Sequence, residues 1–115
     1  NISQRTSPKM VDIWCNENDY TSFQFSSSKE IYHTNVLLSI GETTAVLCAE
    51  IVDEKFRNAL VSSIKKTHRL ILITEEQMGS FAGNLLQVKS KTGNKFWIMS
   101  NLEILIPIPN RRKHL

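Results

Sequence analysis

The feature that most constrains the fold is residues 31–41, where a polar triplet beginning at His33 precedes an apolar run that stops at Gly41. Side chains alternate between the two faces of a strand, so a strand over this segment carries His33 at its opening edge. One face of that strand is then expected to be buried through three aliphatic side chains, Val36, Leu38 and Ile40. An imidazole at such an edge is either a catalytic group beside a pocket or a histidine that only serves the fold.

The segments that follow complete a unit of strand, strand, helix and strand. Residues 43–51 are rich in Ala, Val, Leu and Ile with little alternation, which predicts a strand covered on both faces and paired antiparallel with the first across Gly41. Asp53 is expected to cap a helix that ends near Thr67. Residues 70–73 form a short apolar segment that predicts the closing strand. The fold class is therefore α/β (α+β).

Further elements are expected on both sides of this unit. On the N-terminal side these are a helix over residues 8–17 with Ser7 as N-cap and an alternating strand over residues 20–25. On the C-terminal side they are a polar connector over residues 75–80 and a hairpin whose strands cover residues 85–88 and 96–99. The second group begins another unit of the same kind.

Charge and hydropathy argue against two classes of partner. The formal net charge is +3, and much of the excess lies in Arg111, Arg112 and Lys113 near the end of the 115 residues. A nucleic-acid-binding surface needs a basic face with interleaved aromatic side chains, which this pattern lacks. We therefore expect no nucleic-acid partner and, because no apolar run is long enough to span a bilayer, no membrane.

The two cysteines, Cys15 and Cys48, belong to no motif with metal-ligand spacing. Cys48 lies in an apolar run and is expected to be a small buried side chain, whereas Cys15 follows Trp14 in a more open setting. His68 and His114 are expected to be solvated or capping residues. No metal site is predicted, and a reduced cytoplasmic location is the default.

Four short segments carry a resemblance to a known family. In order they are Tyr-His-Thr-Asn at residues 32–35, Glu-Gln-Met at 76–78, Phe-Ala-Gly-Asn at 81–84 and Met-Ser at 99–100. Together they resemble the pentein superfamily of guanidine-modifying enzymes, which holds arginine deiminases, dimethylarginine hydrolases and amidinotransferases. The sequence looks most similar to a bacterial amidinotransferase-like branch, over residues 2–100.

The resemblance implies a five-bladed β/α propeller, of which this chain would be a fragment. One complete strand-strand-helix-strand blade and parts of its neighbours are then expected within residues 1–100, as a partial domain. Residues 101–115 form a divergent C-terminal tail, in which Pro107 and Pro109 exclude a helix or a central strand.

The resemblance also implies a chemistry and a site. In this family a cysteine thiolate attacks the guanidinium carbon and a histidine protonates the departing amine, with no cofactor. His33 matches the catalytic histidine, while Asn35 and Asn84 are the expected contacts to a small guanidino or amidino substrate. Asn35 stands where the deiminase pattern has an aspartate, so it supplies a hydrogen bond without charge.

The family's nucleophilic cysteine follows a glycine-rich segment, and neither Cys15 nor Cys48 has that context. We therefore expect the chain to be a fragment of a hydrolase that bears the catalytic histidine and is inactive alone. Whether the chain should itself be called an enzyme stays open. The alternative is a small non-catalytic α/β module for binding or assembly. In the fragment, the missing blades leave strand edges bare, which predicts self-association.

Overall fold

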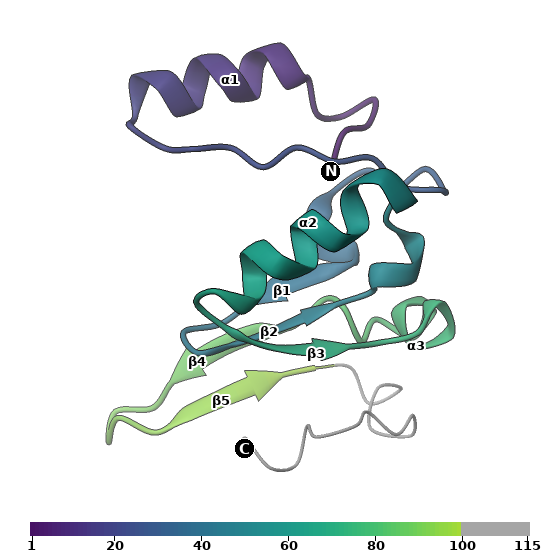
Figure 1. Ribbon diagram of the computed structural model, residues 1–115. Helices are drawn as coiled ribbons and strands as arrows, with labels where there is room; N and C mark the ends of the chain where they lie inside the picture. The colour runs from purple at the N-terminus through teal and green to yellow at the C-terminus, as the bar shows by residue number, and fades with distance from the viewer. Residues whose placement is uncertain (100–115) are drawn as a thin grey trace.

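The computed structural model describes residues 1–99, which form a mixed α+β fold of helices and small sheets (Figure 1). Two short 3₁₀ helices, η1 and η2, interrupt the regular elements. The order along the chain is α1 (Pro8–Glu17), η1 (Thr34–Val36), β1 (Leu38–Ile40), β2 (Thr44–Leu47), η2 (Ala49–Ile51), α2 (Glu54–Lys65), β3 (Arg69–Leu72), α3 (Glu75–Gly79), β4 (Leu86–Lys89) and β5 (Lys95–Ile98).

The predicted strand-strand-helix-strand unit is confirmed. β1 pairs antiparallel with β2 across the Gly41 turn, and β2 pairs parallel with β3, so α2 forms the crossover between the parallel strands. In Figure 1 α2 lies along one side of this sheet. Every residue of β2 is buried, as predicted for a strand covered on both faces.

The core is aliphatic and centres on β2. The largest fully buried side chains come from the segment before β1, from β2 and from the residues after it: Leu37, Val46, Leu47, Cys48, Ile51 and Val52. α2 contributes Leu60 and Ile64, which fall on one face of the helix because they are four residues apart. This core holds the first unit together without the hairpin.

The prediction for residues 31–41 is wrong in its first half. Residues 34–36 form a 3₁₀ helix, so β1 contains only three residues. The 3₁₀ turn brings Leu37 and Ser39 to the inner face, and Ile40 points outward with 58% of its surface exposed. His33 therefore lies at the start of η1 and not at the edge of a strand.

Two further predictions need correction. Residues 20–25 run extended and form no strand ladder among residues 1–99. Their backbone pairing there is limited to single bonds such as the one from the Ile2 amide to the Phe25 carbonyl at 2.7 Å. Asp53 occupies the N-cap position of α2 but makes no capping bond, because its carboxylate accepts a hydrogen bond from the Ser26 hydroxyl instead. The predicted alternation places Phe23 and Phe25 on the same face, whereas in the structure Phe25 is buried and Phe23 is exposed.

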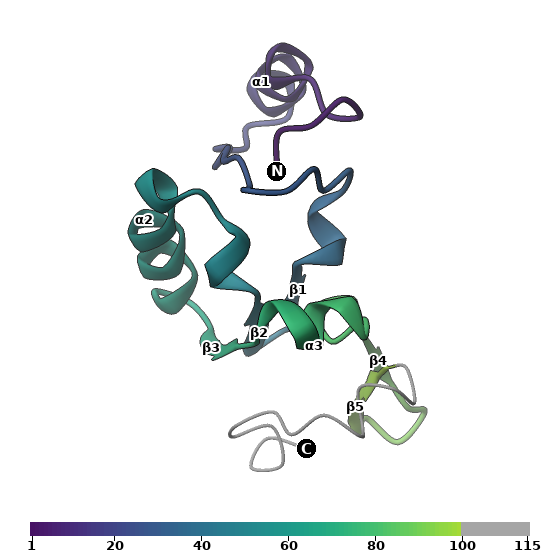
Figure 2. The same ribbon diagram turned by 90° about the vertical axis from the view of Figure 1, so that its right-hand side faces the viewer.

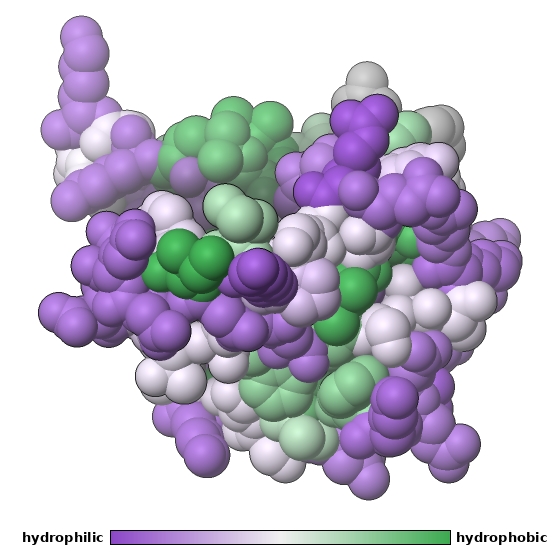
Figure 3. Space-filling model, turned by 90° about the horizontal axis from the view of Figure 1, so that it is seen from above, coloured by the Kyte–Doolittle hydropathy of each residue, from purple (hydrophilic) through white to green (hydrophobic). Residues whose placement is uncertain are grey.

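The N-terminal helix and the hairpin agree with prediction. Ser7 caps α1 by accepting from the Met10 amide, and β4 pairs antiparallel with β5. α1 has no buried residue. The Trp14 ring on this helix stacks on the Tyr20 ring, with 5.3 Å between the ring centroids. Seen from above, over α1, the surface carries separate apolar patches among polar side chains (Figure 3).

Predictions for the tail at residues 101–115 lie outside the described residues, as does Ser100. Within residues 1–99 no helix is long and apolar enough to cross a bilayer.

Candidate functional site

The candidate site is built from two turns that are far apart in the sequence. One is the η1 turn, which follows His33, and the other is the turn at residues 81–84 after α3. Gly83 is buried against the first turn, since a Cβ added there would lie 2.6 Å from the Val36 carbonyl oxygen. Only glycine allows this approach of the two backbones.

Ser39 in β1 joins the same two segments by hydrogen bonds. Its hydroxyl donates to the Gly83 carbonyl and accepts from the Leu85 amide at 2.8 Å. Ser39 is buried, so both bonds are shielded from water. Asn84 lies between the two bonded residues, and its backbone position is therefore set by β1 (Figure 2, where α3 and the turn after it lie beside β1).

α3 holds the other end of the second turn. Thr74 and Gln77 form a capping box in which the Thr74 hydroxyl accepts from the Gln77 amide at 3.1 Å and the Gln77 side chain accepts from the Thr74 amide at 2.8 Å. The Ala82 amide then donates to the Gln77 carbonyl at 3.0 Å. The backbone reverses at Phe81, which has a φ of 68°.

The three predicted site residues are all accessible. His33 is exposed at the N-cap position of η1 and its side chain makes no capping bond. Asn35 is exposed within η1, and Asn84 is exposed in the second turn. The structure thus brings the two turns that carry these residues into contact through Gly83 and Ser39.

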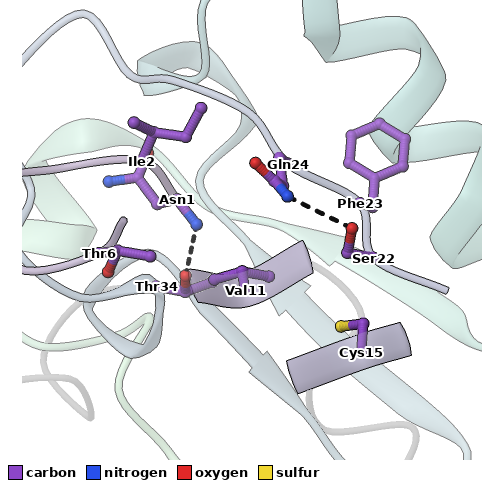
Figure 4. Close-up of a pocket in the computed structure, with 9 residues that line it drawn as sticks. All are labelled: Asn1, Ile2, Thr6, Val11, Cys15, Ser22, Phe23, Gln24 and Thr34. Atoms are coloured by element: carbon purple, nitrogen blue, oxygen red, sulfur yellow. Dashed lines mark hydrogen bonds between the residues drawn. The ribbon is translucent and has the colours of Figure 1, made fainter. Parts of the chain in front are cut away.

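A pocket of about 310 Å³ lies next to the η1 turn, between α1 and the extended segment that follows it (Figure 4). Its lining residues are Asn1, Ile2, Thr6, Val11, Cys15, Ser22, Phe23, Gln24 and Thr34. None of these side chains is charged, so the pocket has no carboxylate to hold a guanidinium. Thr34, beside His33, is its one link to the candidate site.

The two cysteines differ in how accessible their thiols are. Cys48 is fully buried at the end of β2, and burial raises the pKa of its thiol, with the negative charges of Glu50 and Glu75 acting in the same direction. A raised pKa leaves less of the reactive thiolate. Cys15 is partly exposed on α1, on the wall of the uncharged pocket.

His68 stabilises the fold through hydrogen bonds at both ring nitrogens. Its Nε2 donates to the Gly41 carbonyl at 2.9 Å and its Nδ1 accepts from the Thr67 hydroxyl at 2.7 Å, so the ring ties the end of α2 to the β1–β2 turn. In the described part of the chain, no group of three or more His, Cys, Asp or Glu residues is arranged to hold a metal ion.

Sequence reasoning missed three residues of this site: Ser39, Gly83 and Phe81. A serine within an apolar run was a usable signal, because a buried hydroxyl needs partners. A glycine between Ala82 and Asn84 was another, since it permits close backbone contact. Nothing in the sequence indicated the left-handed backbone at Phe81, because a bulky residue seldom adopts it.

Comparison with known proteins adds the family. No curated protein and no solved structure matches the chain. A family model described as "N,N dimethylarginine dimethylhydrolase, eukaryotic" matches residues 1–106, which is most of the chain. This family is a member of the pentein superfamily, so the resemblance found in the four short segments is confirmed at that level. The chain belongs to the eukaryotic N,N-dimethylarginine dimethylhydrolase family.

Proposed function

We propose that this chain carries the general-acid side of a hydrolase that cleaves a C–N bond of a small guanidino compound, N,N-dimethylarginine or a relative of it. His33 is the general acid, and Asn35 and Asn84 hydrogen-bond the substrate. The observation that carries the proposal is the close contact of Gly83 with the η1 turn, together with the two hydrogen bonds by which Ser39 in β1 fixes the residues on either side of Asn84. The family match over residues 1–106 supports the same chemistry.

The reaction runs in two steps in this proposal. A thiolate adds to the guanidinium carbon, forming a C–S bond, and the C–N bond to the departing amine breaks as His33 gives that nitrogen a proton. Water then adds to the carbon and the C–S bond breaks, which releases a ureido product and restores the thiolate; of the two protons set free, one returns to His33 and the other goes to solvent. An amidinotransferase-like outcome differs only in the second step, where an amine replaces water.

The thiolate comes from a cysteine outside these 115 residues. Cys48 is buried with a raised thiol pKa, which suppresses the nucleophilic form. Cys15 lies on α1, which buries no residue and is not part of the two joined turns. The chain is then a fragment of the active enzyme and is inactive alone.

The larger architecture is also part of the proposal. The β1–β2–α2–β3 unit corresponds to one blade of a five-bladed β/α propeller, and the β4–β5 hairpin corresponds to the start of the next. Support comes from the repeated element order and from the family. Residues 1–100 are then a partial domain, followed by a divergent tail.

The binding part is tested by titrating the ¹⁵N-labelled chain with N,N-dimethylarginine. We expect amide shifts at residues 33–35 and 81–85, with binding weakened roughly tenfold or more by Asn84→Ala, since a hydrogen bond to a charged group contributes about 1.5–3 kcal/mol. Asn58→Ala, on the exposed side of α2, is the matched control and keeps full affinity. Shifts confined to other parts of the chain contradict the site.

The catalytic part is tested by measuring release of citrulline and dimethylamine. We expect none from the purified chain, because a set of cooperating catalytic groups loses most of its rate when one is missing. Turnover by the chain alone contradicts an external nucleophile. Loss of that turnover in Cys15→Ser would then identify Cys15 as the nucleophile.

A binding or assembly module is the second candidate, favoured by the exposed apolar side chains of the hairpin. Leu86, Phe96 and Ile98 are each more than half exposed. Such a face, together with the open edges of the sheet, favours self-association. Light scattering across a concentration series measures this self-association, which the fragment reading predicts as well. The titration with N,N-dimethylarginine separates the two candidates, because a module of this kind does not bind the substrate.

A further inference from the structure

Phe81 is the one bulky residue of residues 1–99 with a left-handed backbone. Its φ is 68°, and the other non-glycine residue with positive φ is Asp19, whose short polar side chain tolerates that region. Phe81 follows the C-cap of α3, a place where glycine is usual because it adopts this conformation without steric cost. A phenylalanine here is therefore unfavourable for the backbone.

Packing of the Phe81 side chain does not compensate for its unfavourable backbone conformation. The Phe81 side chain is 55% exposed, whereas its neighbour Ala82 is fully buried and anchors the turn. The turn is also held by backbone bonds that any residue could make, from the Phe81 amide to the Met78 carbonyl and from the Ala82 amide to the Gln77 carbonyl. Strained residues of this kind persist where a function needs the side chain in that place.

The position of the Phe81 ring suggests which group of a ligand it contacts. The turn at residues 81–84, in which Phe81 and Asn84 are exposed, contacts the η1 turn through Gly83, and His33 and Asn35 are exposed at the η1 turn. In the described part of the chain, the cation–aromatic contacts join Arg5 to Tyr32 and Lys55 to Phe56, which leaves the Phe81 ring without such a partner. The flat face of a ring attracts a cation.

We infer that Phe81 is a specificity-determining residue whose exposed ring stacks on the guanidinium cation of the substrate. The inference rests on the proposed function and deepens it, because it names the group that selects a charged substrate where Asn35 supplies only a neutral hydrogen bond. A neutral ureido compound of the same length gains nothing from this ring, so the site favours the substrate over the product.

The test compares L-arginine with L-citrulline, its neutral ureido analogue, by NMR titration of the intact chain. Phe81→Asn removes the ring and keeps a residue that tolerates a positive φ. We expect it to weaken arginine binding about two- to fivefold, the ratio that corresponds to an exposed cation–aromatic contact, and to leave citrulline binding unchanged. Phe81→Tyr keeps an aromatic face and retains the preference for arginine.

Thermal unfolding separates this role from a structural one, because the two predict opposite signs. If the ring serves a ligand, Phe81→Gly and Phe81→Asn relieve the backbone and the Tm stays the same or rises. A lower Tm in both variants shows that the ring is packed and overturns the inference.

The remaining outcomes are also decisive. Equal arginine affinity in Phe81→Asn and the unaltered chain overturns the role of Phe81 and leaves the proposed function standing. If the unaltered chain binds neither L-arginine nor N,N-dimethylarginine, both the role of Phe81 and the proposed function are overturned.

Discussion

The two sheets of this chain differ in how they are stabilised. All four residues of β2 are buried, and its sheet is covered by α2 and by the residues of the aliphatic core. The β4–β5 hairpin has no buried residue on either strand, and its paired positions Leu86 and Ile98 are 62% and 54% exposed. The first sheet is stabilised by its own hydrophobic core, whereas the β4–β5 hairpin depends on its contacts with the rest of the chain.

The attachment of the hairpin is local and mostly polar. The Gln87 side chain accepts from the Glu42 amide at 2.7 Å, Lys95 pairs with Glu42, and the Trp97 ring covers Gly41. A two-stranded hairpin is marginally stable by itself in water. We therefore expect the hairpin to open more readily than the first sheet, while the candidate site lies at the junction between the two.

The largest expected effect tests the core of the first sheet. Leu47→Ala removes a side chain with no exposed surface and should lower the free energy of unfolding by about 2–5 kcal/mol. The matched control, Leu86→Ala on the exposed face of the hairpin, should change it by no more than about 0.5 kcal/mol. Urea unfolding measures both, and similar losses would contradict the contrast between the sheets.

A second substitution tests the junction. Gly83→Ala places a methyl group 2.6 Å from the Val36 carbonyl oxygen, and since backbone cannot yield easily, we expect a loss of about 1–3 kcal/mol. Gly79→Ala is the control, because a Cβ there meets no atom within 4 Å. If Gly83→Ala is as stable as Gly79→Ala, the two turns are not in contact.

The thiol of Cys48 reports on opening of the core. Burial raises its pKa in the folded chain, so the unfolded chain loses its proton first as the pH rises. Above the unfolded pKa, about 8.5, the unfolded state binds fewer protons and folding stability falls with pH. This decline in the free energy of unfolding should be smaller in Cys48→Ala. Urea unfolding over a pH range of about 7 to 10 measures it in both chains.

Alkylation by iodoacetamide gives the kinetic counterpart of that measurement. Cys15 is partly exposed and should react on the order of tenfold or more faster than Cys48. Equal rates for the two thiols would mean that the core around Cys48 opens readily, which would contradict a stable first sheet.

The smallest effect concerns the ion pair that ties the hairpin to the first sheet. Lys95 and Glu42 have side chains that are 42% and 60% exposed, so Lys95→Gln should cost no more than about 1 kcal/mol. We expect faster amide exchange in β4 and β5 and unchanged exchange in β2. A change in β2 would show that the two sheets open together.

Much of the fold could be predicted because local pattern and burial agree there. The uninterrupted apolar run of β2, the spacing of Leu60 and Ile64 on α2 and the glycine-containing turn before β5 each predict the observed element. Residues 20–25 show where pattern fails. Phe23 and Phe25 alternate with polar residues as in a strand, but within residues 1–99 no strand pairs with this segment.

The site was predicted only in part. The residue types at His33, Asn35 and Asn84 could be selected from short segments, and the family match places them within residues 1–106. Their roles remain proposals. The serine in the apolar run pointed to a buried hydroxyl, but the sequence did not show its partners, which lie more than forty residues away. Nothing in the sequence indicated the positive φ of Phe81.

The sequence by itself determined the order of elements, the buried central strand and the superfamily, because these depend on hydrophobic pattern and on short segments that keep their order. Only the tertiary structure decided that His33 begins a 3₁₀ turn and that Gly83 and Ser39 join this turn to Asn84. The physical reason is that a close backbone contact and a buried hydrogen bond both depend on groups brought together from distant parts of the chain, which no local pattern records.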